Sequence, residues 1–441
     1  MSSEWPVVTV DEVCELIVDC VNKTAPVVTY ATPYRMIRTT NIRKGRVSLE
    51  SCRYVDEDTY KKWTRRAKLQ YGDVLLTREA PIGEIGFVDV PEGLFLGQRV
   101  MQYRADVRVL HPRFLHYSFL SPSLQHQFDS HEGSGSVVSH IRVGDCFKFK
   151  ISLPPLDVQK GVAELLGAID DRITLLRETN ATLEAIARAL FKSWFVDFDP
   201  VRTKAEGVDP EGMDATIAAL FPDSFEESGL GLVPKGWLVG SVEDLCTQIS
   251  NGGTPSRSKK EFWDVGTTPW FKTGELADGF LLESGEKISD SGINGSSVKV
   301  LPAGAVLMAI YAAPTVGRLG ILTKPSTFNQ ACTGMVAKKS VGTWFLFLTL
   351  YFGRDWFNNR ANGAAQQNIS KAIVAGYPVV IPDEQVLSAF NGIAAVLFAK
   401  VRAGSEQAKT LTQLRDTLLP RLISGQLRLP EAEVMVEEIC A

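Results

Sequence analysis

The chain has 441 residues, of which 45% are hydrophobic and 22% are charged, and its formal net charge is −4. This length predicts about two to four globular domains, at roughly 100–200 residues each. The charge excludes a protein that holds nucleic acid by bulk positive charge. There is no uninterrupted apolar run of about 18 residues and no signal-peptide layout, so we expect no membrane span. Scattered cysteines without a CxxC pair predict reduced thiols and a cytoplasmic location.

In chain order, residues 1–154 form the first β-rich head. Short β-branched and aromatic stretches, broken by Gly, Pro and Asn, predict strands over 73–77, 85–90 and 147–153. A long helix over 155–198 follows, with no proline after Pro155. Its apolar side chains alternate at spacings of three and four, which is a heptad seam. The seam residues are Leu166, Ile169, Ile173, Leu176, Asn180, Leu183, Ala187, Leu190 and Trp194.

Residues 199–236 are an acidic linker that Gly and Pro punctuate, with one short helix expected near 213–220. A second head over 237–382 has predicted strands over 305–311, 319–323 and 377–381. A second long helix over 383–425 carries a weaker seam that contains Gly404 and Arg415. Residues 426–441 are expected to be a loosely held acidic tail.

The second half of the chain repeats the first. Three blocks of the first head return at an offset of 232: Trp5, Val10 and Cys14 as Trp237, Val242 and Cys246; Gly72-Asp73-Val74-Leu75 as Gly304-Ala305-Val306-Leu307; and Gln98 as Gln330. Several blocks in one order at nearly one offset indicate a tandem duplication. We therefore predict an α+β fold in which two β-rich heads are separated by two long helices, packed as an antiparallel coiled coil with pseudo-twofold symmetry. Asn180 either fixes the register of that coiled coil or faces solvent.

The charge is distributed unevenly along the chain. Residues 1–154 hold 20 basic and 18 acidic side chains (+2), residues 155–236 hold 8 and 15 (−7), residues 237–382 hold 13 and 10 (+3), and residues 383–441 hold 6 and 8 (−2). Both heads are mildly basic. Their cations cluster with hydroxyl and amide side chains, which suit phosphates, sugars and base edges. Each cluster alone is also consistent with a solvated face, but the presence of one in both heads favours nucleic-acid contact.

No catalytic constellation is present in the sequence. All five histidines lie within residues 111–140, so the two copies cannot share a site that needs His. There is no GxxxxGK[ST] phosphate loop and no His or Cys spacing typical of a metal site. The sequence therefore predicts neither an enzyme nor a metal or cofactor in this chain.

In its order of heads and helices, the chain resembles the specificity (S) subunit of type I restriction-modification systems. The resemblance rests on the order of heads and helices and on local stretches of the second half and of the first helix. These are Gly231-Leu232-Val233-Pro234-Lys235-Gly236-Trp237, Asn251-Gly252-Gly253-Thr254-Pro255, Thr268-Pro269-Trp270-Phe271-Lys272-Thr273-Gly274, Phe191-Lys192-Ser193-Trp194-Phe195 and Leu414-Arg415-Asp416-Thr417-Leu418-Leu419-Pro420-Arg421. The first head departs from the pattern, because Asn22-Lys23-Thr24-Ala25-Pro26 stands where Gly-Gly-Thr-Pro falls in the second.

The resemblance implies a non-catalytic DNA-recognition subunit whose heads are target recognition domains. Each head would read one half of an asymmetric, bipartite target in double-stranded DNA, and the helices would measure the spacer. Two methyltransferase (M) subunits, which bind S-adenosylmethionine, and two restriction (R) subunits would be its partners, with no membrane involved. On the long helices, Phe195 and Phe198 lie off the seam and are the expected M-subunit contacts, whereas Trp194 is expected in the core.

Position in the two heads selects the expected DNA-binding side chains. In the first head they are Arg35, Arg38, Asn41, Arg43, Lys44, Arg46, Arg78, Gln98, Arg99, Ser136, His140 and Arg142. In the second head they are Thr254, Ser256, Arg257, Lys259, Lys260, Lys272, Thr273, Tyr311, Gln330, Gln367, Asn368 and Lys371. Gln98 and Gln330 occupy equivalent positions, so they serve either the fold or DNA contact. The alternative function is a non-catalytic coiled-coil scaffold whose two heads bind protein.

Overall fold

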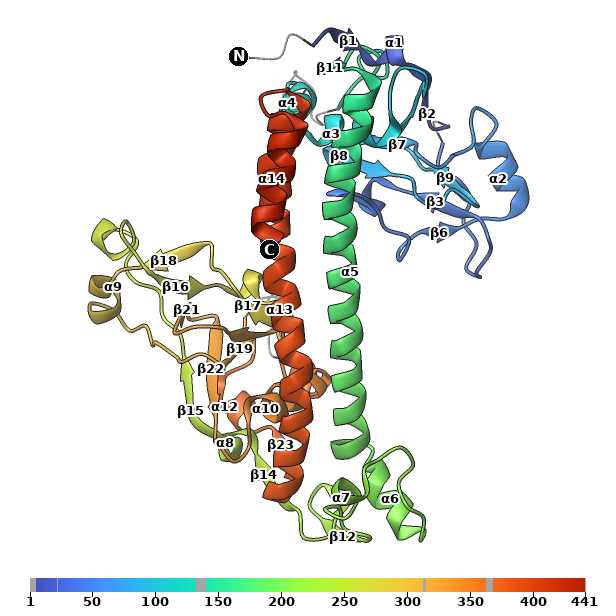
Figure 1. Ribbon diagram of the computed structural model, residues 1–441. Helices are drawn as coiled ribbons and strands as arrows, with labels where there is room; N and C mark the ends of the chain where they lie inside the picture. Colours follow the sequence, from blue (N-terminus) through green and yellow to red (C-terminus); the bar gives the residue numbers. More distant parts are fainter. Residues whose placement is uncertain (1–4, 22, 132–139, 312–314, 362–367, 441) are drawn as a thin grey trace. The chain divides into compact units, whose positions relative to one another are not determined.

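The computed structural model describes residues 5–21, 23–131, 140–311, 315–361 and 368–440 (Figure 1). The chain divides into two compact units. Unit 1 comprises Met1–Thr174 and Ala408–Ala441, and unit 2 comprises Leu175–Gln407. Each unit therefore combines one β-rich head with a part of both long helices.

The head of unit 1 contains a six-stranded sheet of order β2-β10-β7-β8-β5-β4, a three-stranded sheet of order β6-β3-β9, and the pair β1-β11. The central strand β7 is buried on both faces at Val74, Leu75 and Leu76. The elements of this head are β1 (Val7–Thr9), α1 (Val10–Val13), β2 (Cys14–Asp19), β3 (Arg35–Ile37), the 3-10 helix η1 (Thr39–Asn41), β4 (Ile42–Arg43), β5 (Gly45–Val47), β6 (Arg53–Tyr54), α2 (Glu57–Trp63), β7 (Val74–Arg78), β8 (Ile82–Phe87), β9 (Leu94–Leu96), β10 (Val100–Ala105), α3 (Pro112–Leu120), α4 (Pro122–Asp129) and β11 (Lys150–Ser152).

The head of unit 2 contains a five-stranded sheet of order β15-β22-β19-β20-β17, a three-stranded sheet of order β18-β16-β21, and the pair β14-β23. Its elements are β14 (Leu238–Ser241), α8 (Val242–Leu245), β15 (Cys246–Asn251), the 3-10 helix η2 (Lys260–Phe262), β16 (Thr268–Phe271), the 3-10 helix η3 (Thr273–Glu275), β17 (Gly279–Leu281), β18 (Glu286–Ile288), α9 (Asp290–Asn294), β19 (Val306–Ala309), β20 (Leu319–Leu322), β21 (Thr327–Phe328), β22 (Cys332–Ala337), α10 (Thr343–Phe352), α11 (Arg354–Asn359), α12 (Lys371–Ala375) and β23 (Pro378–Ile381).

The two heads have the same topology, which confirms the tandem repeat. The strand orders β2-β10-β7-β8-β5 and β15-β22-β19-β20-β17 correspond strand by strand, and so do β6-β3-β9 and β18-β16-β21. Even the short helices α1 and α8 begin alike, since Thr9 forms a capping box with Glu12 and Ser241 forms one with Asp244. Each of the six predicted strands overlaps an observed one, although the observed bounds differ by a few residues.

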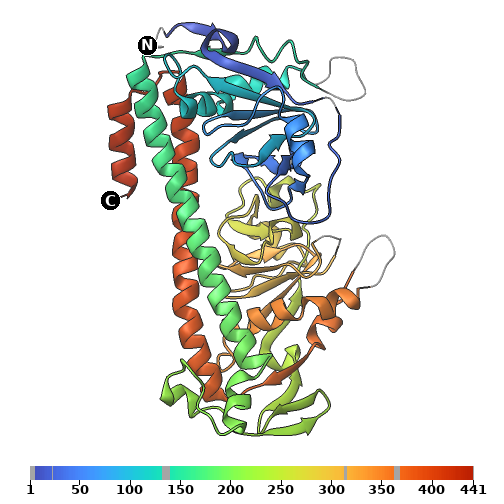
Figure 2. The ribbon, with the colours of Figure 1, turned by 90° about the vertical axis from the view of Figure 1, so that its right-hand side faces the viewer.

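Two long helices, α5 (Leu156–Phe195) and α13 (Glu384–Ile423), pack side by side within each unit (Figures 1 and 2). The predicted seam faces the packing interface, because no residue of either seam is exposed. Contacts pair Asp170 with Arg415 in unit 1 and Asn180 with Val401 in unit 2, so residue numbers rise on one helix as they fall on the other. The helices are therefore antiparallel, as predicted.

Asn180 fixes the register of this pair. Its Nδ2 donates to the carbonyl of Val401 and to Oγ of Ser405, both at 3.0 Å. The side chain lies against Gly404, where a Cβ atom would come within 2.5 Å of Asn180 Oδ1. Gly404, which weakens the seam of α13, thus makes room for the amide of Asn180 in the seam of α5.

The heads dock on the helix pair through polar and aromatic contacts. In unit 1, Asp170 accepts hydrogen bonds from Tyr117 of α3 at 2.9 Å and from Arg415 of α13 at 2.7 Å. In unit 2, Trp344 of α10 stacks on Phe398 of α13 with ring centroids 4.3 Å apart. Unit 2 has a polar contact as well, because Nη1 of Arg188 on α5 donates to the hydroxyl of Tyr351 on α10 at 3.0 Å.

The linker and the C-terminal tail are more ordered than the sequence predicts. The linker forms α6 (Asp199–Ala205), α7 (Ala215–Ala218) and the hairpin β12 (Phe225–Ser228) and β13 (Gly231–Pro234), and it buries Val201 and Phe221 in the core of unit 2. The tail forms α14 (Leu429–Cys440), which lies beside α5 in unit 1 (Figure 2), where Leu429 fills the space above Gly161. Buried apolar side chains therefore hold both segments against the rest of their units: Val201 and Phe221 for the linker, and Leu429 for the tail.

The expectation that Phe195 and Phe198 form a partner surface is wrong for Phe195. Its ring is 8% exposed and packs edge-on against Phe345 and Phe390 in the core of unit 2. Phe198 is half-buried and lies against Trp237. Trp194 is in the core, as expected. The seam identifies the face that meets the other helix, but the head covers the neighbouring face as well.

Among the described helices, α13 has the length and apolar content of a membrane span, with a mean hydropathy of 1.5 over 18 residues. In unit 2, Ala394, Phe398 and Val401 of this helix are buried in the protein. Packing against the head and α5 accounts for these apolar residues. A core helix of a globular protein can have the same length and mean hydropathy as a membrane span.

Candidate nucleic-acid interface

Two backbone hydrogen bonds tie together the segments that carry predicted DNA contacts in the first head. The N–H of Arg78 donates to the carbonyl of Arg99 at 2.8 Å, and the N–H of Ile141 donates to the carbonyl of Arg78 at 3.0 Å. The end of β7, the turn before β10 and the segment before β11 therefore meet at one place. Nη1 of Arg78 reinforces this junction by donating to the carbonyl of Ile141 at 3.0 Å.

The second head contains the same two bonds. The N–H of Ile310 donates to the carbonyl of Ala331, and the N–H of Ile369 donates to the carbonyl of Ile310, both at 2.9 Å. Residues 78, 99 and 141 of the first head thus correspond to 310, 331 and 369 of the second. We call this shared set of backbone bonds the recognition frame.

A Thr–Gln pair braces the frame in both heads. Oγ1 of Thr24 donates to Oε1 of Gln98 at 3.3 Å, and Oγ1 of Thr254 donates to Oε1 of Gln330. An equivalent pair on a shared frame favours the structural role for the two glutamines. The exposed Gln330 still leaves its amide nitrogen for another acceptor.

Close approach of the backbone explains the two glycines before Thr254. A Cβ atom on Gly252 would overlap the carbonyls of Phe328 and Asn329, and one on Gly253 would lie 2.7 Å from Oγ of Ser297. The segment that follows β15 can therefore pass this close to the end of β21 and to Ser297 only because these two residues lack side chains.

A cation followed by threonine begins a 3-10 helix in each head. Arg38 precedes Thr39, the first residue of η1, as Lys272 precedes Thr273, the first residue of η3. The N–H of Arg38 donates to Oδ1 of Asn41 at 3.0 Å, and the N–H of Lys272 donates to Oε2 of Glu275 at 2.7 Å. These caps place both cations at the same position on the two heads.

Asn41 is therefore a correction to the expected DNA contacts. It is 1% exposed, and its side chain also donates to the carbonyl and hydroxyl oxygens of Ser48 and Ser51. Because these bonds occupy the amide inside the turn, Asn41 shapes η1 and does not face a ligand.

The frame presents different side chains in the two heads. Glu79, Arg99 and His140 of the first head correspond in position to Tyr311, Ala331 and Asn368 of the second. Arg99 pairs with Glu79 at 3.0 Å and is 52% exposed, whereas Tyr311 forms a backbone bridge with Asn368 and is 41% exposed. Charged groups in one head thus replace an aromatic and an amide group in the other.

Other expected contacts of the first head are held by the protein itself. Arg43 donates to the carbonyl of Thr39 at 2.7 Å and lies 3.7 Å from Glu84, which also accepts from the N–H of Lys44. Arg46 donates to the hydroxyl of Thr174 on α5, so its guanidinium docks the head on the helix. Arg35 is half-buried in β3, and Arg142 is exposed.

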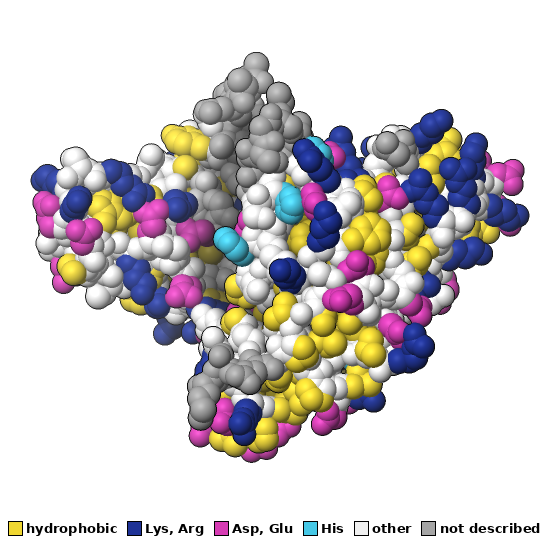
Figure 3. All heavy atoms as spheres, turned by 90° about the horizontal axis from the view of Figure 1, so that it is seen from above, with side chains coloured by type: hydrophobic (Ala, Val, Ile, Leu, Met, Phe, Trp, Pro, Cys, Tyr) yellow, Lys and Arg dark blue, Asp and Glu magenta, His cyan; other side chains and the backbone are white. Residues whose placement is uncertain are grey.

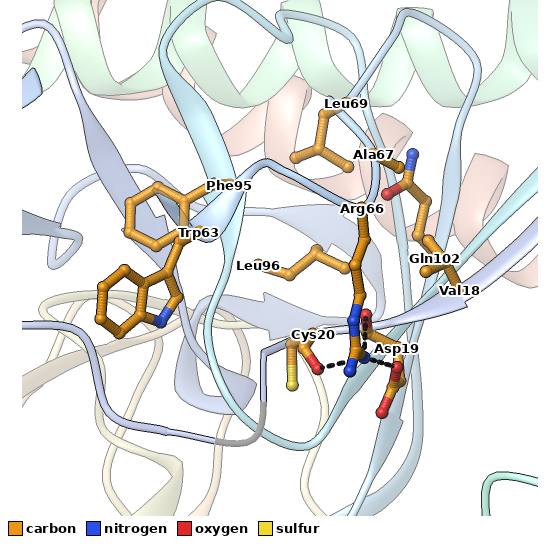
Figure 4. Close-up of a pocket in the computed structure, with 10 residues that line it drawn as sticks. All are labelled: Val18, Asp19, Cys20, Trp63, Arg66, Ala67, Leu69, Phe95, Leu96 and Gln102. Carbon is orange, nitrogen blue, oxygen red and sulfur yellow. Dashed lines mark hydrogen bonds and ion pairs between the residues drawn. The ribbon is translucent and has the colours of Figure 1, made fainter. Parts of the chain in front are cut away.

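Further cations of the first head lie on and after α2. Figure 3 shows Lys and Arg side chains gathered at the right-hand end of the face in view, on the side where Figure 1 draws α2. Lys61 and Lys62 of α2, and Arg65 just after it, are exposed. Arg66 points instead into a small pocket, where it bonds to the carboxylate of Asp19 and to the carbonyl of Cys20 at 3.1 Å (Figure 4). Arg66 therefore anchors the segment after α2 to β2.

The basic loop of the second head, 254–260, is largely exposed. Ser256 and Ser258 share a hydrogen bond of 2.8 Å, Lys259 lies over the ring of Phe262, and Lys260 begins η2. Arg257 and Lys272 both reach Glu286, an acid that the sequence did not single out. Lys371 is exposed at the start of α12. Ser136 and Gln367 lie outside the described residues.

Within the described part of the chain, no three His, Cys, Asp or Glu side chains converge to hold a metal ion. The residues that sequence reasoning missed are Thr24, Glu79 and Glu286. Thr24 carried a signal, since it stands 230 residues before Thr254, as Gln98 stands 232 before Gln330. Glu79 and Glu286 carried no such signal, because a carboxylate on its own does not indicate contact with the phosphates of a nucleic acid.

Comparison with known proteins gives consistent matches. A family described as "Type I restriction modification DNA specificity domain" matches residues 2–185 and 234–391. The HindI specificity subunit of Haemophilus influenzae is 28% identical over 406 residues, which cover 81% of this chain and 87% of that protein. The MjaIX specificity subunit of Methanocaldococcus jannaschii is 24% identical over 363 residues, covering 82% and 78%. A crystal structure of a type I S subunit from M. genitalium shares the fold, with a TM-score of 0.57 at 13% identity, and covers 95% of this chain and 96% of that one.

Proposed function

Because the chain belongs to the type I restriction-modification DNA specificity family, whose specificity subunits are non-catalytic, we propose that its two target recognition domains read the two halves of one bipartite target in double-stranded DNA. The observation that carries the proposal is the recognition frame. The same backbone bonds recur in both heads and present Glu79 and Arg99 in one but Tyr311 and Ala331 in the other. Different side chains on one frame predict two different half-sites, so the target is asymmetric.

The long helices connect the heads, and we propose that they set the length of the unread spacer. In unit 2 their antiparallel pairing includes the partly buried hydrogen bonds of Asn180 with Val401 and Ser405, which favour the observed register. A fixed register is what a ruler between two half-sites requires, as the spacing of half-sites follows protein geometry in other DNA readers.

The proposed partners are two methyltransferase subunits and two restriction subunits, in the cytoplasm. The methyltransferase subunits would bring S-adenosylmethionine, and this chain would supply sequence recognition and a scaffold for assembly. The net charge of −4 supports such a division of labour, because the partners would then supply much of the phosphate neutralisation.

The test is to express the chain with its methyltransferase subunits and to sequence the methylated adenines of the host genome. A bipartite motif should appear with this chain and disappear when it is deleted. Methylation that stays unchanged on deletion would contradict the proposal. The scaffold alternative predicts in addition that the purified complex binds motif and shuffled duplexes equally well.

A further inference from the structure

Glu286 of the second head sits between two cations. It begins β18, and its Oε1 accepts from Nζ of Lys272 at 2.7 Å, while Oε2 accepts from Nη1 of Arg257. The hydrogen bond from Arg257, with Lys272 beside it, lowers the pKa of Glu286 below its ordinary value. The carboxylate therefore stays charged and holds both cations at neutral pH.

Aromatic side chains complete the support of Arg257. Its guanidinium lies 3.7 Å from the ring centroid of Trp263 and 5.0 Å from that of Trp270. Both rings are fixed in place, because Nε1 of Trp263 donates to the carbonyl of Ser256 at 3.2 Å and Nε1 of Trp270 donates to that of Gly253 at 2.9 Å. A guanidinium that is stacked and ion-paired loses little further freedom when it binds a ligand.

Both cations remain accessible in this arrangement. The side chain of Arg257 is 54% exposed and that of Lys272 is 43% exposed, against 27% for Glu286. The bond to Glu286 uses Nη1 of Arg257 and leaves the Nε–Nη2 edge for a second acceptor. That edge is a planar pair of donors, which is the geometry that binds O6 and N7 of guanine side by side.

The first head has the opposite charge at the position of Glu286. Met36 of β3 faces Arg53 of β6, as Trp270 of β16 faces Glu286 of β18. Arg38, which corresponds to Lys272, donates instead to the carbonyl of Ser51 at 2.8 Å. An exposed arginine thus stands in the first head where the second carries the carboxylate that orients its cations.

We propose that Glu286 is a positioning residue for recognition of the second half-site, which holds Arg257 in the orientation that reads a guanine and holds Lys272 toward the adjoining phosphate. This inference rests on the proposed function and deepens it. Because Arg53 replaces the carboxylate in the first head, position 53/286 is a specificity-determining difference between the heads.

The test uses the complete chain with its methyltransferase subunits and duplexes that carry the methylation motif or a single base change in either half-site. Glu286→Gln keeps the shape of the side chain but removes its charge. It should reduce discrimination against a changed guanine in the second half-site by about ten-fold or more, since one good bidentate contact supplies that much. Discrimination at the first half-site should be unchanged.

Two further variants separate orientation from charge and from fold. Arg257→Lys keeps the charge but lacks the planar donor pair, so it should reproduce the loss at the same base. Glu243→Gln removes an exposed acid of α8 in the same unit and should behave like the parent chain. The reciprocal change Arg53→Glu should alter discrimination at the first half-site only.

The inference is overturned if either Glu286→Gln or Arg257→Lys discriminates like the parent chain. It is also overturned if Glu286→Gln reduces discrimination at both half-sites equally and lowers the melting temperature, because that result would indicate a merely structural role. If the parent chain itself leaves genomic methylation unchanged, the proposed function fails first, and that result differs from each of the others.

Discussion

The pKa of His116 in α3 depends on burial and on the charged side chains around it. Burial lowers the pKa of this imidazole to about 4, and its Nδ1 has no partner among the described residues. Asp170 opposes this shift, while Arg113, Arg415 and Arg46 add to it. The imidazole is therefore neutral in the folded chain at neutral pH, and it packs edge-on against the ring of Phe87.

This burial makes the stability of the chain depend on pH. Between pH about 6.5 and about 4 the unfolded state binds a proton at His116 that the folded state does not, so stability falls as the pH is lowered through this window. The loss should reach roughly 3 kcal/mol in the free energy of unfolding, at about 1.4 kcal/mol for each pKa unit. Urea unfolding of the chain between pH 4 and pH 7 measures it.

The variant that removes the effect is His116→Phe, because Phe347 follows Phe345-Leu346 in α10 as His116 follows Phe114-Leu115 in α3. It should flatten this part of the pH profile. His126→Phe, at an exposed position of α4, should leave the profile as it is. Equal slopes for the parent chain and His116→Phe would contradict the assignment.

At the scale of elements, the antiparallel helix pair is specified by complementary exceptions to its heptad pattern. Asn180 on α5 and Gly404 on α13 both break the apolar seam, and in the structure they lie against one another. A polar group in a seam is stabilised only where the partner helix offers acceptors and space, so such a pair selects one register.

Gly404→Ala should destabilise the chain by about 1–3 kcal/mol, because the new Cβ would lie 2.5 Å from Oδ1 of Asn180. Thermal unfolding measures the effect, and the double variant Asn180→Ala with Gly404→Ala should recover part of it. Gly392→Ala on the same helix has nothing within 4 Å of its Cβ and should stabilise by about 0.5–1 kcal/mol. A neutral Gly404→Ala would show that the amide moves aside at no cost.

At the scale of the whole molecule, the duplication gives each head its own stretch of the helix pair. Unit 1 holds one end of both helices and unit 2 holds the other. Both helices run through both units, so the lengths of the two helices stay matched only if an insertion is made in each of them. This is the basis on which the proposed spacer measurement can be tested.

Insertion of one heptad into each helix, near Asn180 and near Ala408, keeps both seams in phase and lengthens the pair by about 10 Å, at about 1.5 Å per residue. The unread spacer of the methylation motif should lengthen by no more than about three base pairs, at about 3.4 Å each, with both half-sites unchanged. Insertion into one helix alone serves as the control, because it breaks the register. An unchanged spacer in the double insertion would refute the ruler.

The sequence predicts the fold correctly, but it does not predict which side chains of the candidate site are exposed. Heptad spacing and offset repeats can be read directly from the order of residues, without knowledge of which segments meet in space, so they predicted the helices, their seams and the duplication. The same reasoning placed Asn41 and Phe195 on binding surfaces, because an amide in a basic loop and an aromatic beside a seam look available until their partners are known. Glu286 was missed for the same reason, since its role depends on two cations 14 and 29 residues away.

The sequence by itself determined that this chain is a tandem repeat of a β-rich head and a long amphipathic helix, because periodicity records which face of each element is buried. Only the tertiary structure decided which of the predicted contact residues are exposed and which are bonded within the protein. Whether a polar side chain is used by the protein or left for a ligand depends on neighbours from distant segments, such as Thr24 for Gln98 and Thr174 for Arg46. Those neighbours meet only when the chain is folded.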